Sequence, residues 1–240
     1  MKVAQLIVSI LGFGGTIVAL TFGFRQYRRA EAWKRGEFVA REIKEFQLDP
    51  LAVNAMQMID WGERRINLYL KECPEYVSCP RVDRKILGLA LLPHEIKAQY
   101  PSPEIPKVDI AKTRFTPDEV RIRDTFDVFL NYLQRFGNFI AAKLISAEEL
   151  EPYLKYWLGS IASENPDADI ADDEMWRCVL LAYINHYGYT GVVNLFKAFE
   201  YDISPSAQVF ERLIARMEDK QLGNTLLEIM CTQTPTTKCG

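Results

Sequence analysis

The pattern of apolar and polar positions begins with one uninterrupted apolar segment near the amino terminus. Residues 3–24 contain no charged side chain, and they lie between Lys2 and Arg25. As a helix, this segment reaches about 33 Å, which is enough to cross the hydrocarbon core of a bilayer. We therefore predict that residues 1–24 form a transmembrane anchor.

Two other interpretations of this segment are weaker. A secretory signal peptide has a shorter apolar region that ends in small residues, whereas this one ends in Phe22, Phe24 and Arg25. A helix buried in a soluble core keeps a polar face, and residues 3–24 lack one. A retained anchor is therefore the preferred interpretation.

Small residues recur within the predicted anchor. Gly15, Ala19 and Gly23 are spaced four apart, and Gly12 lies on the neighbouring face of the helix. Such a stripe lets two helix backbones approach closely in lipid, where packing drives association. The stripe is either a contact for a second helix or the ordinary composition of a membrane helix.

The next two hundred residues show mainly helical periodicity. Apolar positions continue at helical spacing through residues 25–48, which we predict to be a basic juxtamembrane helix. Asp49-Pro50 ends this helix and caps the next, whose apolar stripe extends over residues 51–70. Prolines interrupt residues 72–116, where the apolar run 85–92 is a short helix or a strand, with helix preferred.

Helix signals are clearest from Thr116 onward. Thr116 is expected to cap a helix that has Pro117 in its first turn, and Ser146 and Glu149 form a capping box for another. Gly188 and Gly191 are expected to interrupt the chain. Apolar stripes predict helices near residues 126–144, 150–161, 176–187, 192–199, 209–217 and 222–230.

These elements predict an all-α fold, in which an N-terminal transmembrane helix is followed by a multi-helix cytoplasmic domain. We place that domain at residues 49–231, with a sub-boundary near residues 100–116. Residues 232–240 are expected to form a disordered tail.

Charge sets the expected orientation. Residues 25–44 hold seven Lys or Arg and three Glu, a net charge of +4. Because the whole chain carries −3 and Lys2 adds +1, residues 45–240 carry −8. Positive residues stay on the cytoplasmic side of a membrane, so we expect the amino terminus outside and the domain inside. An acidic domain also argues against a nucleic-acid partner.

The basic residues after the anchor are candidate lipid contacts. Each is expected to attract anionic head groups by about 1 kcal/mol. The alternative is that these charges only set the topology. We name this set the basic collar; it consists of Arg25, Arg28, Arg29, Lys34 and Arg35.

Motifs for catalysis or metal binding are not found. The five cysteines are odd in number and unclustered, which is typical of a reducing compartment. The chain has no P-loop, nucleophile elbow or zinc-protease motif. A Ser-His-Asp or Cys-His site would have to use His94 or His186, and neither has the acid three residues ahead that a di-iron bundle requires. A calcium loop counted from Asp167 lacks the glycine at its sixth position. We therefore expect no catalytic residue, no metal and no cofactor.

Two segments resemble a group of known proteins. Residues 28–40 directly after a single anchor, followed by Asp60 to Arg64, resemble uncharacterised bacterial single-pass membrane-anchored helical proteins, some of them cyanobacterial. Residues 126–150 are similar in style to the second half of those proteins. The resemblance implies a bacterial plasma membrane, or a thylakoid membrane in a cyanobacterium. It implies no activity and no site, because these proteins have no assigned function.

The preferred functional hypothesis is a non-enzymatic membrane-anchored adaptor or scaffold. It would hold a protein partner, or itself as a homo-oligomer, at the cytoplasmic surface, with membrane lipid as a further partner. The alternative is a membrane-bound sensor or regulator that binds a small ligand between helices, and an enzyme is third. A deep polar pocket would favour ligand chemistry, and an exposed aromatic patch would favour the adaptor.

Overall fold

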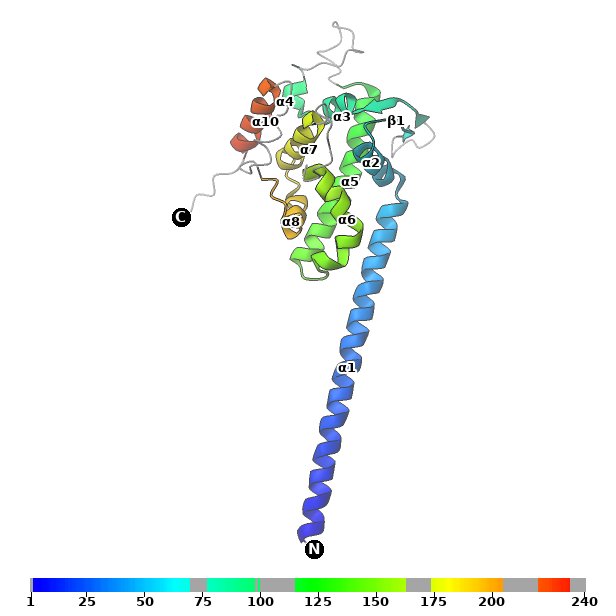
Figure 1. The fold of residues 1–240 in the computed structure, drawn as a ribbon, viewed down its shortest axis with the longest axis vertical. Coiled ribbons are helices and arrows are strands. Elements are labelled where there is room, and N and C mark those ends of the chain that lie inside the picture. Colours follow the sequence, from blue (N-terminus) through cyan, green and yellow to red (C-terminus); the bar gives the residue numbers. More distant parts are fainter. Residues whose placement is uncertain are drawn as a thin grey trace. The chain divides into compact units, whose positions relative to one another are not determined.

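The computed structural model describes residues 2–69, 77–97, 99, 115–162, 174–204 and 220–233, with side chains in residues 20–68, 77–97, 99, 115–162, 175–204 and 220–228. The chain divides into two compact units, residues 1–44 and residues 45–240. Most described residues are helical, as Figure 1 shows, which confirms the predicted helical class. Most of the predicted sub-boundary near residues 100–116, the start of the loop counted from Asp167 and the helix near 209–217 lie outside the described residues.

The first unit consists of α1, which spans Lys2–Leu48 and continues without a break through the predicted juxtamembrane segment. Leu20, Phe22 and Phe24 are exposed, and so are all five residues of the basic collar. A side chain at Gly23 would meet nothing within 4 Å. The stripe positions Gly12, Gly15 and Ala19 lie outside the residues whose side chains are described, as does most of the predicted anchor. Among the residues that are described, no helix is long and apolar enough to cross a membrane.

The second unit is a helical body with two short antiparallel strand pairs. Its helices are α2 (Pro50–Asp60), α3 (Arg84–Leu91), α4 (His94–Lys97), α5 (Pro117–Ala141), α6 (Ala147–Ala162), α7 (Glu174–His186), α8 (Thr190–Ala198) and α10 (Lys220–Gln233). Its strands are β1 (Glu63–Arg65), β2 (Leu68–Tyr69), β3 (Val77–Ser78) and β4 (Arg81–Asp83), paired as β1 with β4 and β2 with β3.

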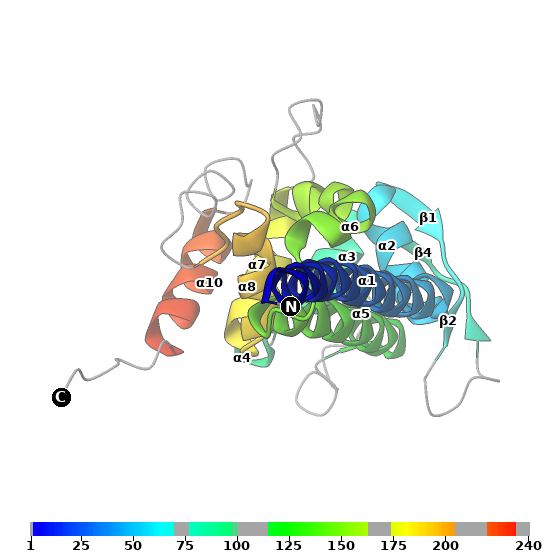
Figure 2. The ribbon, with the colours of Figure 1, turned by 90° about the horizontal axis from the view of Figure 1, so that it is seen from below.

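Helix α5 is the centre of the body. It packs against α8, α2 and α3, and Figures 1 and 2 show α7 and α8 on one side of α5 and α2 on the other. Within the apolar stripe predicted over residues 126–144, five large side chains of α5 are fully buried, and each stabilises the fold by about 1.5–3 kcal/mol. They are Phe126, Phe129, Leu130, Leu133 and Phe136, whereas Leu144, beyond the end of α5, is exposed.

Side-chain caps fix where the helices begin. The Glu119 backbone N–H donates to Thr116 Oγ1 over 3.2 Å, and the Thr116 N–H donates to Glu119 Oε2 over 2.8 Å. Ser146 and Glu149 form the same reciprocal pair before α6. Asp49 Oδ1 accepts the Leu51 N–H over 2.9 Å at the start of α2. These caps satisfy backbone donors that have no partner within the helix, and they confirm the predicted boundaries.

The helix predicted over residues 51–70 is wrong beyond Asp60. After α2 the chain extends into β1 and β2. Strand β1 pairs with β4, and β2 pairs with the nearer β3, through the registers Glu63 to Asp83 and Leu68 to Ser78. Ile66 and Leu68 are buried on either side of the exposed Asn67, which is the alternation of a strand. The preferred helix over the apolar run 85–92 is confirmed as α3.

Only one of the two predicted glycine interruptions is present. Gly188 has a φ of +71° and reverses the chain after α7, a conformation that costs glycine little. Gly191 instead lies inside α8, where it faces Gly137 of α5. A Cβ at Gly137 would overlap the Gly191 carbonyl oxygen, so the two helices cross at backbone contact.

Candidate functional site: a cavity between α5 and α7

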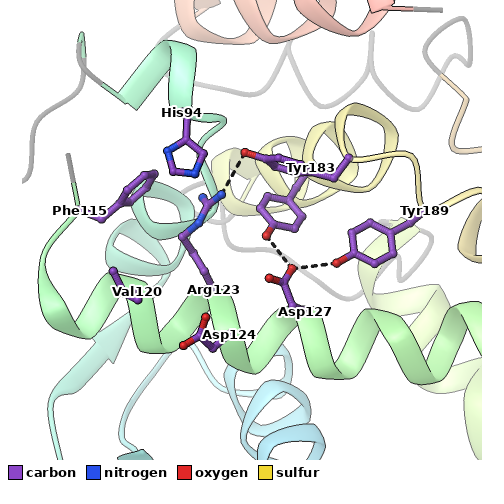
Figure 3. A pocket seen from close by; sticks show the side chains of 9 residues that line it. His94, Phe115, Val120, Arg123, Asp124, Asp127, Tyr183 and Tyr189 are labelled. Atoms are coloured by element: carbon purple, nitrogen blue, oxygen red, sulfur yellow. Dashed lines mark hydrogen bonds between the residues drawn. The ribbon is translucent and has the colours of Figure 1, made fainter. Parts of the chain in front are cut away.

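A cavity of about 510 Å³ lies against one face of α5, within the second unit. Its side chains come mainly from α5 and from the tyrosines of α7 and the turn that follows it (Figure 3). The cavity reaches the surface, because His94 and Tyr187 are exposed. Its lining consists of His94, Phe115, Val120, Arg123, Asp124, Asp127, Tyr183, Tyr187 and Tyr189.

Arg123 is positioned by the carboxyl-terminal end of α3. Its side chain donates from Nη1 to the Ala90 carbonyl over 2.8 Å and to the Leu92 carbonyl over 2.9 Å. Carbonyls at a helix end lack partners within the helix and carry partial negative charge, so a guanidinium satisfies them well. Nη2 donates to the hydroxyl of Tyr187, the residue that follows α7, over 3.1 Å.

Aromatic rings surround the Arg123 charge. The guanidinium carbon lies 4.5 Å from the centre of the Phe115 ring, 5.0 Å from that of Tyr183 and 5.7 Å from that of Tyr187. Each ring attracts a cation through its negative face. These contacts hold Arg123 at the cavity wall, and none of them neutralises its charge.

Arg123 has no carboxylate partner among the described residues. The side chain is 8 % exposed, and no described Asp or Glu oxygen lies within 4.0 Å of its nitrogens. A guanidinium has five N–H groups, of which three donate to the partners above. The remaining two, at Nε and Nη2, have no acceptor in the described part of the chain. A buried charge without a counterion is costly.

Asp127 follows Arg123 by one turn of α5 and carries the opposite charge. Its Oδ1 accepts the Tyr183 hydroxyl over 2.6 Å and the Tyr189 hydroxyl over 2.8 Å, as Figure 3 shows. Its Oδ2 accepts no hydrogen bond from the described residues. One carboxylate oxygen is thus fixed by tyrosines, and the other remains available to a ligand.

The Tyr183 and Tyr189 hydroxyls keep the protons that they donate to Asp127. Burial raises the pKa of the Tyr183 hydroxyl, while the Arg123 charge lowers it and the nearby Asp127 carboxylate raises it further. Burial likewise raises the pKa of Tyr189, and Asp127 acts in the same direction. Both hydroxyls therefore stay protonated at neutral pH and hold Asp127 in one orientation.

A second buried cation, Lys97, lies close to the cavity and differs from Arg123 because it has a carboxylate partner. Lys97 is fully buried, and its Nζ lies 2.5 Å from Glu119 Oε1 and 3.1 Å from the Leu89 carbonyl oxygen. Burial lowers the pKa of the Lys97 ammonium, and the contact with Glu119 acts in the opposite direction. This ion pair is complete within the protein, so it contributes structure and offers no charge to a ligand.

The two histidines lie near the cavity without forming a catalytic pair. The His94 ring meets Phe115 edge to face, with ring centres 5.0 Å apart. His186 Nε2 lies 3.4 Å from Glu95 Oε2, a contact that becomes an ion pair when the imidazole is protonated. Within the described residues, no group of three His, Cys, Asp or Glu side chains is arranged to hold a metal.

The site predicted from the sequence and the cavity are different places. The basic collar lies on α1, in the first unit, whereas the cavity belongs to the second. Sequence reasoning missed Arg123 and Asp127 because both occur within the apolar pattern of α5, and it assigned Tyr183 and Tyr187 to the core. Their signal was an arginine and an aspartate four apart on a core-facing helix.

Comparisons with known proteins give no independent assignment. No protein-family model matches the chain, and neither the curated proteins nor the solved structures contain a significant match. The function must therefore be inferred from the geometry above.

Proposed function

We propose that this protein is a membrane-anchored binding protein whose helical body takes a small polar ligand in the cavity between α5 and α7. The observation that carries the proposal is the Arg123 guanidinium. It is 8 % exposed, lines the cavity and has two N–H groups without an acceptor among the described residues. A ligand that supplies acceptors would relieve the cost of this buried charge.

The lining chemistry favours binding over catalysis. A guanidinium has only donors and is a poor proton carrier. Tyr183 and Tyr189 are held protonated by burial, which raises the pKa of each hydroxyl, so neither is suited to take a proton from a substrate. A sensor or regulator therefore fits this cavity better than an enzyme.

The membrane part of the proposal rests on α1. The exposed residues Leu20, Phe22 and Phe24 come directly before the basic collar on one continuous helix. Apolar side chains followed by arginines are typical of a helix that leaves a membrane on its cytoplasmic side. A carboxy-terminal reporter should be active only in the cytoplasm, and activity outside would contradict this orientation.

Binding is tested with the full chain in nanodiscs of neutral lipid. Ligand-detected NMR with benzoate, inorganic phosphate, 2-phenylethylamine and L-phenylalanine should show saturable binding of at least one probe. Arg123→Gln should abolish it, whereas Arg135→Gln, on the same helix beside Glu45, should not. Absence of binding by every probe, or equal loss in both variants, would contradict a ligand site at Arg123.

The adaptor remains a second candidate because of one exposed aromatic set. Trp61, Tyr153 and Tyr156 are exposed, and the Tyr156 hydroxyl bonds to Asp60 beside Trp61. Exposed aromatics of this kind are enriched where proteins meet. A photo-crosslinking residue at position 153 should give one discrete membrane-dependent product if a protein partner binds there, and no product if it does not.

A further inference from the structure

We infer that the ligand of this cavity is a small zwitterion that bears a carboxylate and a protonated amine on the same carbon, as a free α-amino acid does. The inference rests on the proposed function and adds the chemical class of the ligand. It follows from the placement of Arg123 and Asp127 one helical turn apart on the same wall of one cavity.

The carboxylate end of such a ligand fits Arg123. The planar guanidinium pairs with carboxylates through parallel N–H groups, and the Nε and Nη2 groups left without a described acceptor provide them. The Tyr187 hydroxyl accepts from Arg123, so its own hydrogen is left to donate to the same carboxylate. The contacts of Nη1 with the Ala90 and Leu92 carbonyls hold the guanidinium in place and leave its Nε and Nη2 edge for the ligand.

The ammonium end fits Asp127. Its Oδ1 is occupied by two tyrosine hydroxyls, and Oδ2 accepts nothing from the described residues, which leaves a charged acceptor for an ammonium group. The Tyr183 and Tyr189 rings lie nearly parallel, at 22°, with centres 6.3 Å apart. Aromatic faces beside a carboxylate add attraction for a cation.

Charge balance argues against ligands with only one of these groups. A simple anion at Arg123 would meet the field of Asp124 and Asp127, which also line the cavity. A simple amine at Asp127 would meet the field of Arg123 and would leave that guanidinium without an anion. A zwitterion places each charge beside its opposite and brings no net charge into the cavity.

The remaining volume favours an apolar side chain on the ligand. A cavity of about 510 Å³ falls within the range of small-molecule sites and exceeds what the charged head group needs. Phe115 and Val120 form an apolar wall beside Arg123, as Figure 3 shows. An amino acid with a large apolar side chain should therefore bind more tightly than glycine.

The experiment compares one molecule with its two halves. The full chain in nanodiscs is titrated with L-phenylalanine, with 2-phenylethylamine, which lacks the carboxylate, and with 3-phenylpropionate, which lacks the amine. L-phenylalanine should bind at least about tenfold more tightly than either, a difference of about 1.4 kcal/mol. Equal binding of either half would overturn the zwitterion class and leave the proposed function standing. Absence of binding by all three, together with benzoate and phosphate, would overturn both.

A matched pair of variants locates the amine. Asp127→Asn keeps the shape and removes the charge, so it should weaken L-phenylalanine binding at least about tenfold while 3-phenylpropionate binds as well or better. Asp60→Asn is the control, because Asp60 also accepts a tyrosine hydroxyl but lies outside the cavity. Binding of 3-phenylpropionate reports that the cavity of the variant is folded. Unchanged affinity of Asp127→Asn for L-phenylalanine would contradict the assignment.

Discussion

Lys97 and Arg123 are two buried cations in the helical body, and they differ in the groups that balance their charge. Lys97 is fully buried and meets the Glu119 carboxylate, so its charge is balanced inside the protein. Arg123, four residues after Glu119 on α5, meets backbone carbonyls, aromatic rings and a cavity. Burial of a charge therefore does not mark a binding site by itself; the identity of its partners does.

The chemistry of the two side chains matches these roles. An ammonium is a compact charge that one carboxylate and one carbonyl can satisfy. A guanidinium presents a planar fork, which can bind structural partners on one edge and a ligand on another. Arg123 has both kinds of edge, because Nη1 faces the end of α3 while Nε and part of Nη2 have no described acceptor.

The largest expected effect comes from removing the carboxylate of the buried Lys97–Glu119 ion pair. Glu119→Gln removes the described counterion of the buried Lys97 ammonium and should lower the free energy of unfolding by about 3–5 kcal/mol. Urea denaturation followed by circular dichroism measures this. Glu151→Gln removes an exposed partner of Lys155 and should cost no more than about 1 kcal/mol. Similar losses in the two variants would contradict the distinction between a structural and a surface pair.

The next effect concerns Arg123, which has no carboxylate partner among the described residues. Arg123→Lys keeps the charge but removes the fork, so it should cost about 1–3 kcal/mol of stability through the lost bonds to Ala90 and Leu92. It should also weaken L-phenylalanine binding at least about tenfold, as measured by titration calorimetry. Arg135→Lys serves as the control. A variant that loses stability but keeps full affinity would show that Arg123, like Lys97, has only a structural role.

Exposed cations extend the comparison to the first unit. A peptide of residues 25–46 should bind vesicles that contain acidic lipid, and Arg28→Gln with Arg29→Gln should weaken this binding by about 1 kcal/mol per residue. Binding should fall as salt rises, because surface charges are screened. Binding that ignores salt and lipid charge would assign it to apolar side chains, and absence of binding would leave the basic collar with a topological role only.

The smallest effect concerns Tyr132, which lies beside Asp49 and Arg135 outside the cavity. Burial and the Asp49 carboxylate raise the pKa of Tyr132 to about 12, and Arg135 there is paired with Glu45. Because the folded state keeps the proton longer than the unfolded chain, stability should be intact below about pH 10 and fall between pH 10 and about 12. Tyr132→Phe should remove that part of the pH dependence and cost about 1 kcal/mol at neutral pH. An unaltered high-pH denaturation profile would contradict the assignment.

Local rules were enough to predict much of the helical body. Thr116, Ser146 and Asp49 cap helices where the sequence places them, because capping depends on residues only a few positions apart. The strands at 63–69 were missed because isolated apolar residues such as Ile66 fit both a helical and a strand period. Their pairing depends on residues 77–83, which no local pattern reveals.

The cavity was missed for a related reason. Arg123 and Asp127 are four apart, as a helix pattern allows, but their roles depend on what faces them. The carbonyls at the end of α3, and Tyr183 of α7, reach them from more than thirty residues away along the chain. Spacing placed Tyr183 on a buried face correctly, but the same prediction for Tyr187 is wrong, because its side chain is exposed. Only the tertiary contacts show that the Tyr183 hydroxyl meets a carboxylate.

The contact between Gly137 and Gly191 has a consequence for how this sequence can change over time. Neither position has room for even a methyl group, since a Cβ on one would overlap the backbone of the other helix. Tyr189, which holds Asp127, lies two residues before Gly191. Exposed neighbours such as Asn194 and Lys197 should tolerate substitution, whereas both glycines must be retained for the two helices to pack this closely. Any lineage that keeps this cavity should keep both of them, even where most of α8 has been replaced.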